Sequence, residues 1–190
     1  INDVGAYTRV NIPYSYRLGL EINGGFSIGD HWRLEGNAAF SRNKVIRHTI
    51  YEDSYDEDFN WLGQEAVVYE NTDLSFSPNF VGGGNLTYKI PVKGNLLEIG
   101  WLHKYVSRQF IDNTSDSNNQ LDAYYVNDLQ VVYNWENRLE INFLLGNIWN
   151  ARYETNAWSY RYSYEGIRAI DQGFYPQAGT HFFVGLKVDL

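Results

Sequence analysis

Residues 14–28 alternate between two kinds of side chain along the whole segment. The even positions are almost all leucine, isoleucine or aromatic residues, whereas the odd positions carry polar residues, charges and glycine. Successive side chains of a β-strand point to opposite faces, so the pattern predicts one long strand with an apolar face and a polar face. Strands in globular proteins usually have about five or six residues. This segment is long enough for a tilted crossing of a lipid bilayer, with its apolar face toward lipid.

The same alternation recurs at six further places along the chain. These segments are residues 32–41, 80–90, 97–105, 128–135, 139–145 and 181–190. No helical period competes over a comparable length, and no apolar run approaches the ~18 residues that a membrane helix needs. The sequence therefore predicts an all-β protein that crosses a membrane as an antiparallel β-barrel.

The connections between these segments alternate between short and long. Short links lie at residues 29–31, 91–95 and 136–137, and long ones at residues 47–77, 110–122 and 150–179. Outer-membrane barrels have short periplasmic turns and long external loops. We therefore expect the long connections on the outer side of the membrane.

Bacterial barrels of this kind have an even number of strands, whereas seven segments are predicted here. We expect the C-terminal portion of a larger barrel, about seven or eight strands, in which residues 1–13 form an external loop or strand end. Residues 14–190 then supply the strands and long external loops. The alternative is a complete eight-stranded barrel with a structural or adhesive role and residues 4–12 as its first strand. That segment alternates weakly and is short for a crossing of about 9–11 residues.

Composition agrees with a membrane barrel. Aromatic residues make up 17% of the chain, including 16 tyrosines and 6 tryptophans, and such residues gather where a barrel meets the lipid headgroups. The chain has no cysteine, which excludes disulfides and thiolate metal sites within it.

Negative charge is concentrated in residues 47–77. This segment has eight acidic residues and one basic residue, so it carries nearly all of the net charge of −8. Nucleic acid is not expected as a partner, because phosphate binding requires clustered lysine and arginine. Since like charges repel, an ordered segment needs Ca²⁺, lysine or arginine from elsewhere in the chain, or a cationic partner.

Four carboxylates in this segment are candidate calcium ligands: Asp53, Asp56, Glu57 and Asp58. Ca²⁺ prefers hard oxygen ligands, although the spacing matches no EF-hand, which requires glycine at its sixth position and glutamate at its twelfth. Two hypotheses remain open. In the first, the segment is a functional loop that Ca²⁺ stabilises or that recognises a cationic group. In the second, it is a solvated external loop. No other cofactor is expected.

Residues 158–164 alternate aromatic residues with serine and arginine. Aromatic faces with an intervening arginine bind sugars, flat chelates or partner proteins, which makes Trp158, Tyr160, Arg161 and Tyr162 candidate ligand-contacting residues. The alternation also predicts a strand that rises above the membrane. The other hypothesis is aromatic packing that stiffens a hairpin in this loop.

The sequence offers no catalytic constellation. Its four histidines fall in different segments with no i, i+4 pair. It has no Gly-x-Ser-x-Gly elbow, and its run of three glycines at residues 82–84 lacks the lysine of a phosphate-binding loop. An outer-membrane hydrolase would need a nucleophile with a histidine and an orienting group. We therefore expect a protein that is not an enzyme.

Three segments resemble the C-terminal barrel strands of TonB-dependent outer-membrane receptors. Residues 146–153 (GNIWNARY) resemble the penultimate-strand motif of that family. Residues 175–186 (YPQAGTHFFVGL) are similar to its last strand, and residues 15–21 (SYRLGLE) to the entry into a descending strand. The three occur in the order of the family, and the resemblance covers most of residues 14–190.

The resemblance implies a 22-stranded barrel in the outer membrane of a Gram-negative bacterium, which imports a scarce nutrient with energy drawn through TonB. Siderophore-bound iron, haem, cobalamin and oligosaccharides are imported on this scaffold. The implied partners are outer-membrane lipid, the rest of the barrel with its plug, TonB through an N-terminal part, and a surface lipoprotein. Two features depart from the family pattern: the chain ends in Leu190 instead of an aromatic residue, and the sequence lacks the globular plug domain.

Overall fold

The computed structural model describes residues 11–136 and 138–189, and their regular structure consists of twelve β-strands. No helix long and apolar enough to cross a membrane occurs in these two ranges. Residues 1–10, Asn137 and Leu190 lie outside the described residues. Most of the expected external segment 1–13 therefore lies outside the described residues, and so does most of the alternative first strand 4–12. The same holds for the last residue of the predicted strand 181–190.

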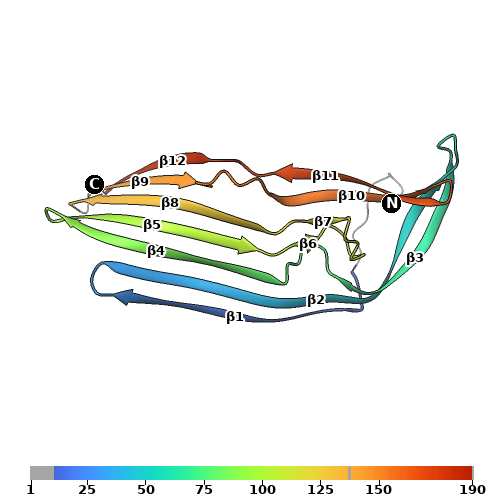
Figure 1. Ribbon diagram of the computed structural model, residues 1–190, viewed down its shortest axis with the longest axis horizontal. Helices are drawn as coiled ribbons and strands as arrows, with labels where there is room; N and C mark the ends of the chain where they lie inside the picture. Colours follow the sequence, from blue (N-terminus) through green and yellow to red (C-terminus); the bar gives the residue numbers. More distant parts are fainter. Residues whose placement is uncertain (1–10, 137, 190) are drawn as a thin grey trace.

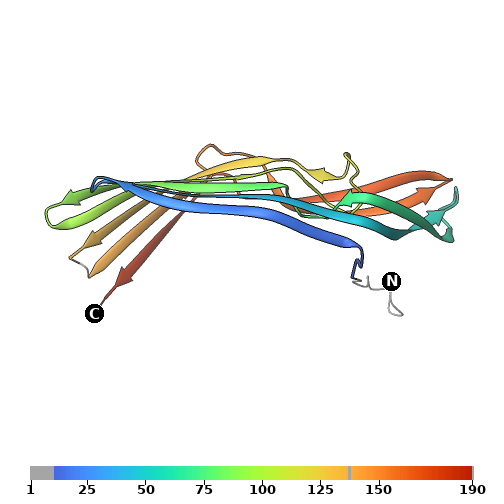
Figure 2. The same cartoon turned by 90° about the horizontal axis from the view of Figure 1, so that it is seen from below.

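Seven long strands of a ten-stranded sheet, here called the wall strands, pair antiparallel with their neighbours in the order β1–β2–β4–β5–β8–β9–β12. Their bounds are β1 Ser15–Ile28, β2 Trp32–Tyr55, β4 Phe80–Val92, β5 Asn95–Val106, β8 Tyr124–Trp135, β9 Leu139–Gly146 and β12 His181–Val188. All seven segments predicted from alternation are confirmed as strands. The sheet is curled along its width and remains open, with β1 and β12 at its two edges (Figures 1 and 2).

One face of this sheet is an apolar band, and many of its side chains are exposed. Register sets even-numbered residues of β1 opposite even-numbered residues of β2, for example Leu20 opposite Phe40. At the other edge, Leu186 of β12 lies opposite Ile141 of β9. Leu20 and Leu186 remain 61% and 70% exposed. A soluble domain would bury such a surface, whereas a lipid-facing sheet leaves it outward.

The opposite face is polar. Near the short turns, Arg33 forms an ion pair of 2.6 Å with Glu35, and Lys89 one of 3.4 Å with Glu98. These side chains line a polar hollow of about 140 Å³. The division into an apolar and a polar face is the one predicted for a strand between lipid and a wet or protein-filled lumen.

The expectation that residues 47–77 form a long loop is wrong in part, because most of this segment is a β-hairpin. Strand β2 continues to Tyr55, and β3 (Trp61–Asp73) returns beside it, from Tyr55 opposite Trp61 to Lys44 opposite Asp73. Both faces of this extension carry polar residues, so the contrast that revealed the other strands is lost. The segment 150–179 likewise contains a hairpin, β10 (Glu154–Tyr164) and β11 (Ile167–Pro176), which confirms the strand predicted at residues 158–164.

The two hairpins join beside the outer half of β2, as a part of the same ten-stranded sheet that extends beyond the other wall strands. Tyr162 and Tyr164 of β10 pair in parallel with Asp53 and Tyr55 of β2, so that β3, the outer half of β2, β10 and β11 form a four-stranded unit, here called the outer sheet (Figure 1). Between β5 and β8 the chain forms only a two-residue ribbon, β6 (Gln109–Phe110) with β7 (Gln120–Leu121). The buried apolar cluster of the described residues, Ile111, Leu121 and Ala157, lies where this ribbon meets β10.

Candidate functional site

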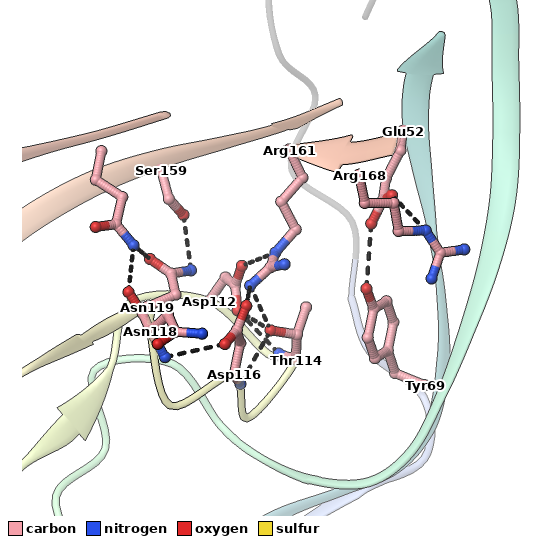
Figure 3. A network of polar contacts seen from close by, with 11 residues as sticks. Glu52, Tyr69, Asp112, Thr114, Asp116, Asn118, Asn119, Ser159, Arg161 and Arg168 are labelled. Carbon is pink, nitrogen blue, oxygen red and sulfur yellow. Dashed lines mark hydrogen bonds and ion pairs between the residues drawn. The ribbon is translucent and has the colours of Figure 1, made fainter. Parts of the chain in front are cut away.

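A group of polar side chains lies where β10 meets residues 111–119, and Arg161 of β10 contacts three of them. Its Nε donates a hydrogen bond to Oδ2 of Asp112 (2.6 Å), and its Nη2 donates to Oδ2 of Asp116 (3.0 Å) and to Oγ1 of Thr114 (2.9 Å). The side chain of Arg161 is 15% exposed. Figure 3 shows it reaching from β10 to these three acceptors. One arginine therefore joins the outer sheet to residues 111–119, here called the acidic turn.

The acidic turn also has hydrogen bonds of its own. Both the backbone N–H and the hydroxyl of Thr114 donate to Oδ1 of Asp112, at 3.0 and 2.6 Å. The backbone N–H of Asn118 donates to Oδ1 of Asp116 at 2.9 Å. Such carboxylate-to-backbone bonds define Asx turns, so the two aspartates shape the turn with one oxygen and hold Arg161 with the other.

Electrostatics keep this contact charged at neutral pH. Burial lowers the pKa of Arg161, but hydrogen bonding and the charge of Asp112 outweigh burial, and the net shift is upward. The pKa of Asp116 is lowered, first by the backbone N–H of Asn118 and then by Arg161. Charge-assisted hydrogen bonds of this kind are about twice as strong as neutral ones.

Two further contacts attach the acidic turn to its surroundings. Asn119 is fully buried and donates to Oγ of Ser159 at 3.1 Å (Figure 3). Nε2 of Gln172 donates to Oδ1 of Asn119 at 3.0 Å. On the other side, Oγ of Ser115 donates to Oδ2 of Asp73 at 3.1 Å. The turn therefore fills the space between β10–β11 and the end of β3.

Basic residues neutralise part of the acidic segment 47–77. Glu52 is 2% exposed, accepts a hydrogen bond from the Tyr69 hydroxyl (3.1 Å) and pairs with Arg168 of β11 at 3.4 Å (Figure 3). Lys44 pairs with Asp73 at 2.9 Å. The sequence predicted that Ca²⁺, lysine or arginine from elsewhere in the chain, or a cationic partner offsets the charge of this segment. The structure shows lysine and arginine in this role.

The four candidate calcium ligands do not converge on one point. Asp53 accepts hydrogen bonds from Trp61 Nε1 and Gln64 Nε2, both at 3.1 Å, and from the Tyr160 hydroxyl at 2.7 Å. Asp56 accepts bonds from Asn60 and from the backbone N–H of Asp58. In residues 11–136 and 138–189, no three His, Cys, Asp or Glu side chains are placed to hold a metal ion. Calcium binding at Asp53, Asp56, Glu57 and Asp58 remains a prediction.

We expect Asp56→Asn to loosen the tip of the β2–β3 hairpin without any role for calcium. Asp56 accepts two bonds from Asn60, at 2.8 Å from its N–H and at 3.0 Å from its side-chain amide, and these bonds lower its pKa. Asparagine keeps one acceptor and loses the charge. The measurement is the rate of chymotrypsin cleavage after the exposed Phe59 in the full-length protein, with and without a chelator. Asp58→Asn is the control, since Asp58 contributes its backbone N–H to the tip. A chelator that speeds cleavage of the unsubstituted protein would instead support calcium binding.

The candidate aromatic residues of β10 lie on a different face from Arg161. Tyr160 stacks on Tyr162, with ring centroids 5.6 Å apart, and its hydroxyl bonds to Asp53; burial first, and then hydrogen bonds to Tyr55 and Asp53, raise the pKa of Tyr160. Trp158 is 48% exposed, and its indole covers the position that a Cβ on Gly173 would take. Tyr160 thus joins β10 to β2 within the outer sheet, whereas Arg161 joins the outer sheet to the acidic turn. Ligand contact through Trp158, Tyr160, Arg161 and Tyr162 remains a prediction.

Sequence reasoning missed Glu52, Asp112, Asp116 and Asn119 as members of this network. Their partners lie far along the chain, 49 residues in the case of Arg161 and Asp112, and such pairing has no local signature. One signal was available. Residues 112–118 read Asp-Asn-Thr-Ser-Asp-Ser-Asn, a composition that favours Asx turns.

Two solved structures share the fold of this chain. No family model matches the sequence, and a search of curated proteins likewise gives no match. The fold resembles the ferric yersiniabactin uptake receptor FyuA from Yersinia pestis, with a TM-score of 0.59 and 15% identity over 90% of this chain and 23% of the receptor. It also resembles the siderophore receptor PiuA from Acinetobacter baumannii, with a TM-score of 0.58 and 17% identity over 86% of this chain and 22% of the receptor.

At these identities the likeness concerns the fold. The all-β sheet described above is a portion of an antiparallel β-barrel, as predicted from the alternating strands. The chain spans less than a quarter of the length of either receptor.

Proposed function

We propose that this chain forms part of the wall and outer mouth of a TonB-dependent transporter in the outer membrane of a Gram-negative bacterium. The observation that carries the proposal is the curled sheet of β1, β2, β4, β5, β8, β9 and β12, which matches barrels named as siderophore receptors. Its apolar face suits lipid, and its polar face suits a lumen that holds a plug. The imported nutrient would be siderophore-bound iron, haem, cobalamin or an oligosaccharide.

In this proposal the chain performs no bond-making chemistry. Both matched structures are named as receptors, which supports a role in binding and transport rather than as an enzyme. The remaining barrel and the plug would contact the polar face of the sheet, and TonB would act through an N-terminal part. The exposed Trp158 and the neighbouring Tyr162 would contact the nutrient or a surface lipoprotein.

The alternative function is a complete eight-stranded barrel with a structural or adhesive role. Its first strand would be residues 4–12, most of which lie outside the described residues. The likeness to receptors more than four times as long as the matched segment favours the transporter.

The experiment that tests the proposal is uptake by whole cells. A strain with the full-length gene and a deletion strain are grown under iron limitation and offered labelled ferric siderophores, haem, cobalamin and oligosaccharides. We expect the deletion to abolish uptake of one of these ligands, and an uncoupler to abolish the same uptake in the intact strain. Equal uptake of every ligand by both strains would contradict the transporter and favour the structural alternative.

A further inference from the structure

The acidic turn has the oxygen spacing of a calcium-binding loop. Calcium loops of the EF-hand type place side-chain oxygens at their first, third and fifth positions. Asp112, Thr114 and Asp116 occupy these positions here. The later positions differ, because Ser117 stands at the sixth place in place of glycine and Ala123 at the twelfth in place of glutamate. The turn therefore has the first half of such a loop and lacks its bidentate carboxylate.

A cation already lies at these oxygens, and it belongs to the chain. The guanidinium of Arg161 is within 3.0 Å of one oxygen from each of the three side chains. The side chains of Asp112 and Asp116 are 20% and 28% exposed, so the contact is largely shielded from water. A planar guanidinium with several donors can satisfy several oxygen acceptors at once.

We propose that Arg161 is the built-in cation of the acidic turn and orders residues 111–119 in place of a divalent metal. The two carboxylates repel each other, and the guanidinium offsets that repulsion while joining the turn to β10. Calcium is then neither required nor able to bind in the unsubstituted protein. Without Arg161, the same oxygens form a vacant cation site that Ca²⁺ can occupy.

The position of Arg161 on β10 lets its side chain reach the acidic turn. Arg161 extends from one face of β10, directly opposite Ile170 of β11, and spans the gap to a turn about 50 residues earlier in the chain. Its neighbour in the outer sheet, Arg168, pairs with Glu52 and keeps a side chain that is 60% exposed. The two arginines therefore offer a comparison of a largely buried arginine side chain with an exposed one.

Trypsin cleavage after Arg108 tests the proposal, because this exposed residue lies just before the acidic turn. Full-length protein in detergent is compared with Arg161→Ala, Asp116→Asn and Arg168→Ala, each with a chelator and with about 5 mM Ca²⁺. That concentration exceeds the dissociation constants of about 0.1–1 mM that are typical of extracellular calcium modules. Heat-modifiable migration on gels shows that each variant retains its barrel.

For the unsubstituted protein we expect slow cleavage that neither chelator nor Ca²⁺ changes. Arg161→Ala should be cleaved about tenfold faster in chelator, because the substitution removes the charged donor of three hydrogen bonds to the turn. The rate of cleavage follows the fraction of molecules in which the turn is open. Ca²⁺ should restore its protection. Asp116→Asn should be cleaved faster in a way that Ca²⁺ does not reverse, because Arg161 still fills the site, and Arg168→Ala should behave as the unsubstituted protein.

Two results would overturn the proposal. If Arg161→Ala is cleaved at the original rate in chelator, the turn needs no cation. If Arg161→Ala is cleaved faster but Ca²⁺ does not protect it, the arginine acts as a hydrogen-bond donor only and does not stand in for a metal. Faster cleavage of the unsubstituted protein in chelator would also contradict it, because a metal would then share the site.

Discussion

Expressed alone and refolded in detergent, residues 1–190 are expected to aggregate instead of forming a closed barrel. Among the described residues, β1 pairs only with β2 and β12 only with β9. Each therefore leaves one row of backbone N–H and C=O groups without a partner. In hydrocarbon every such group costs several kcal/mol, and β1 alone has 14 residues. An open edge of this length is also a template for association with other chains.

The measurement is migration on semi-native gels before and after heating. Aggregated or unstructured protein at both temperatures agrees with a sheet that folds only beside the rest of its barrel. A monomeric, strand-rich and heat-modifiable species would mean that the chain closes on itself. That result would promote the eight-stranded alternative, with residues 4–12 as the missing strand.

Arginine in place of Leu20 is expected to destabilise the full-length barrel by about 2–4 kcal/mol, the cost of a lipid-facing arginine near the bilayer midplane. Leu20 lies in the middle of β1, opposite Phe40 and on the apolar face. Asn23 provides the matched control, since it lies opposite Asn37 on the polar face of the same strand. Asn23→Arg should therefore be tolerated far better.

Reversible unfolding in bilayers or micelles measures both variants under the same conditions. A large loss of unfolding free energy for Leu20→Arg and a small one for Asn23→Arg would support the assignment of faces. Equal losses for the two variants would show that β1 does not separate lipid from lumen, and the orientation of the whole sheet would have to be revised.

The wall strands could be predicted from sequence because the membrane imposes a contrast between their two faces. Leu18, Leu20 and Ile22 alternate with Gly19 and Glu21, and no packing within a soluble core blurs the pattern. The outer half of β2 lacks this contrast. Glu52 and Asp53 are neighbours on opposite faces, and both are polar because one pairs with Arg168 and the other accepts a bond from Tyr160.

The candidate site was predicted less well, for a different physical reason. Alternation in residues 158–164 predicted the strand and implied that Arg161 and Tyr160 point to opposite faces. It could not reveal that Arg161 meets Asp112, since that contact depends on how β10 and the acidic turn meet in three dimensions. The excess of acidic residues in segment 47–77 was more informative about the contacts of that segment. Repulsion within the acidic segment predicted a need for Ca²⁺, for lysine or arginine from elsewhere in the chain, or for a cationic partner, and Lys44 and Arg168 supply the second of these.

The central claim is that the sheet crosses the outer membrane with its two long hairpins outside, and labelling of single cysteines in whole cells tests it most directly. The chain contains no cysteine, so cysteines can be introduced singly into the full-length protein and compared with the unsubstituted one. Asp58 lies at the tip between β2 and β3, and Asp30 lies in the turn between β1 and β2. With a membrane-impermeant maleimide, we expect Asp58→Cys to be labelled in intact cells and Asp30→Cys only after the outer membrane is disrupted. Labelling of Asp30→Cys in intact cells, or of neither residue before disruption, would contradict the claim.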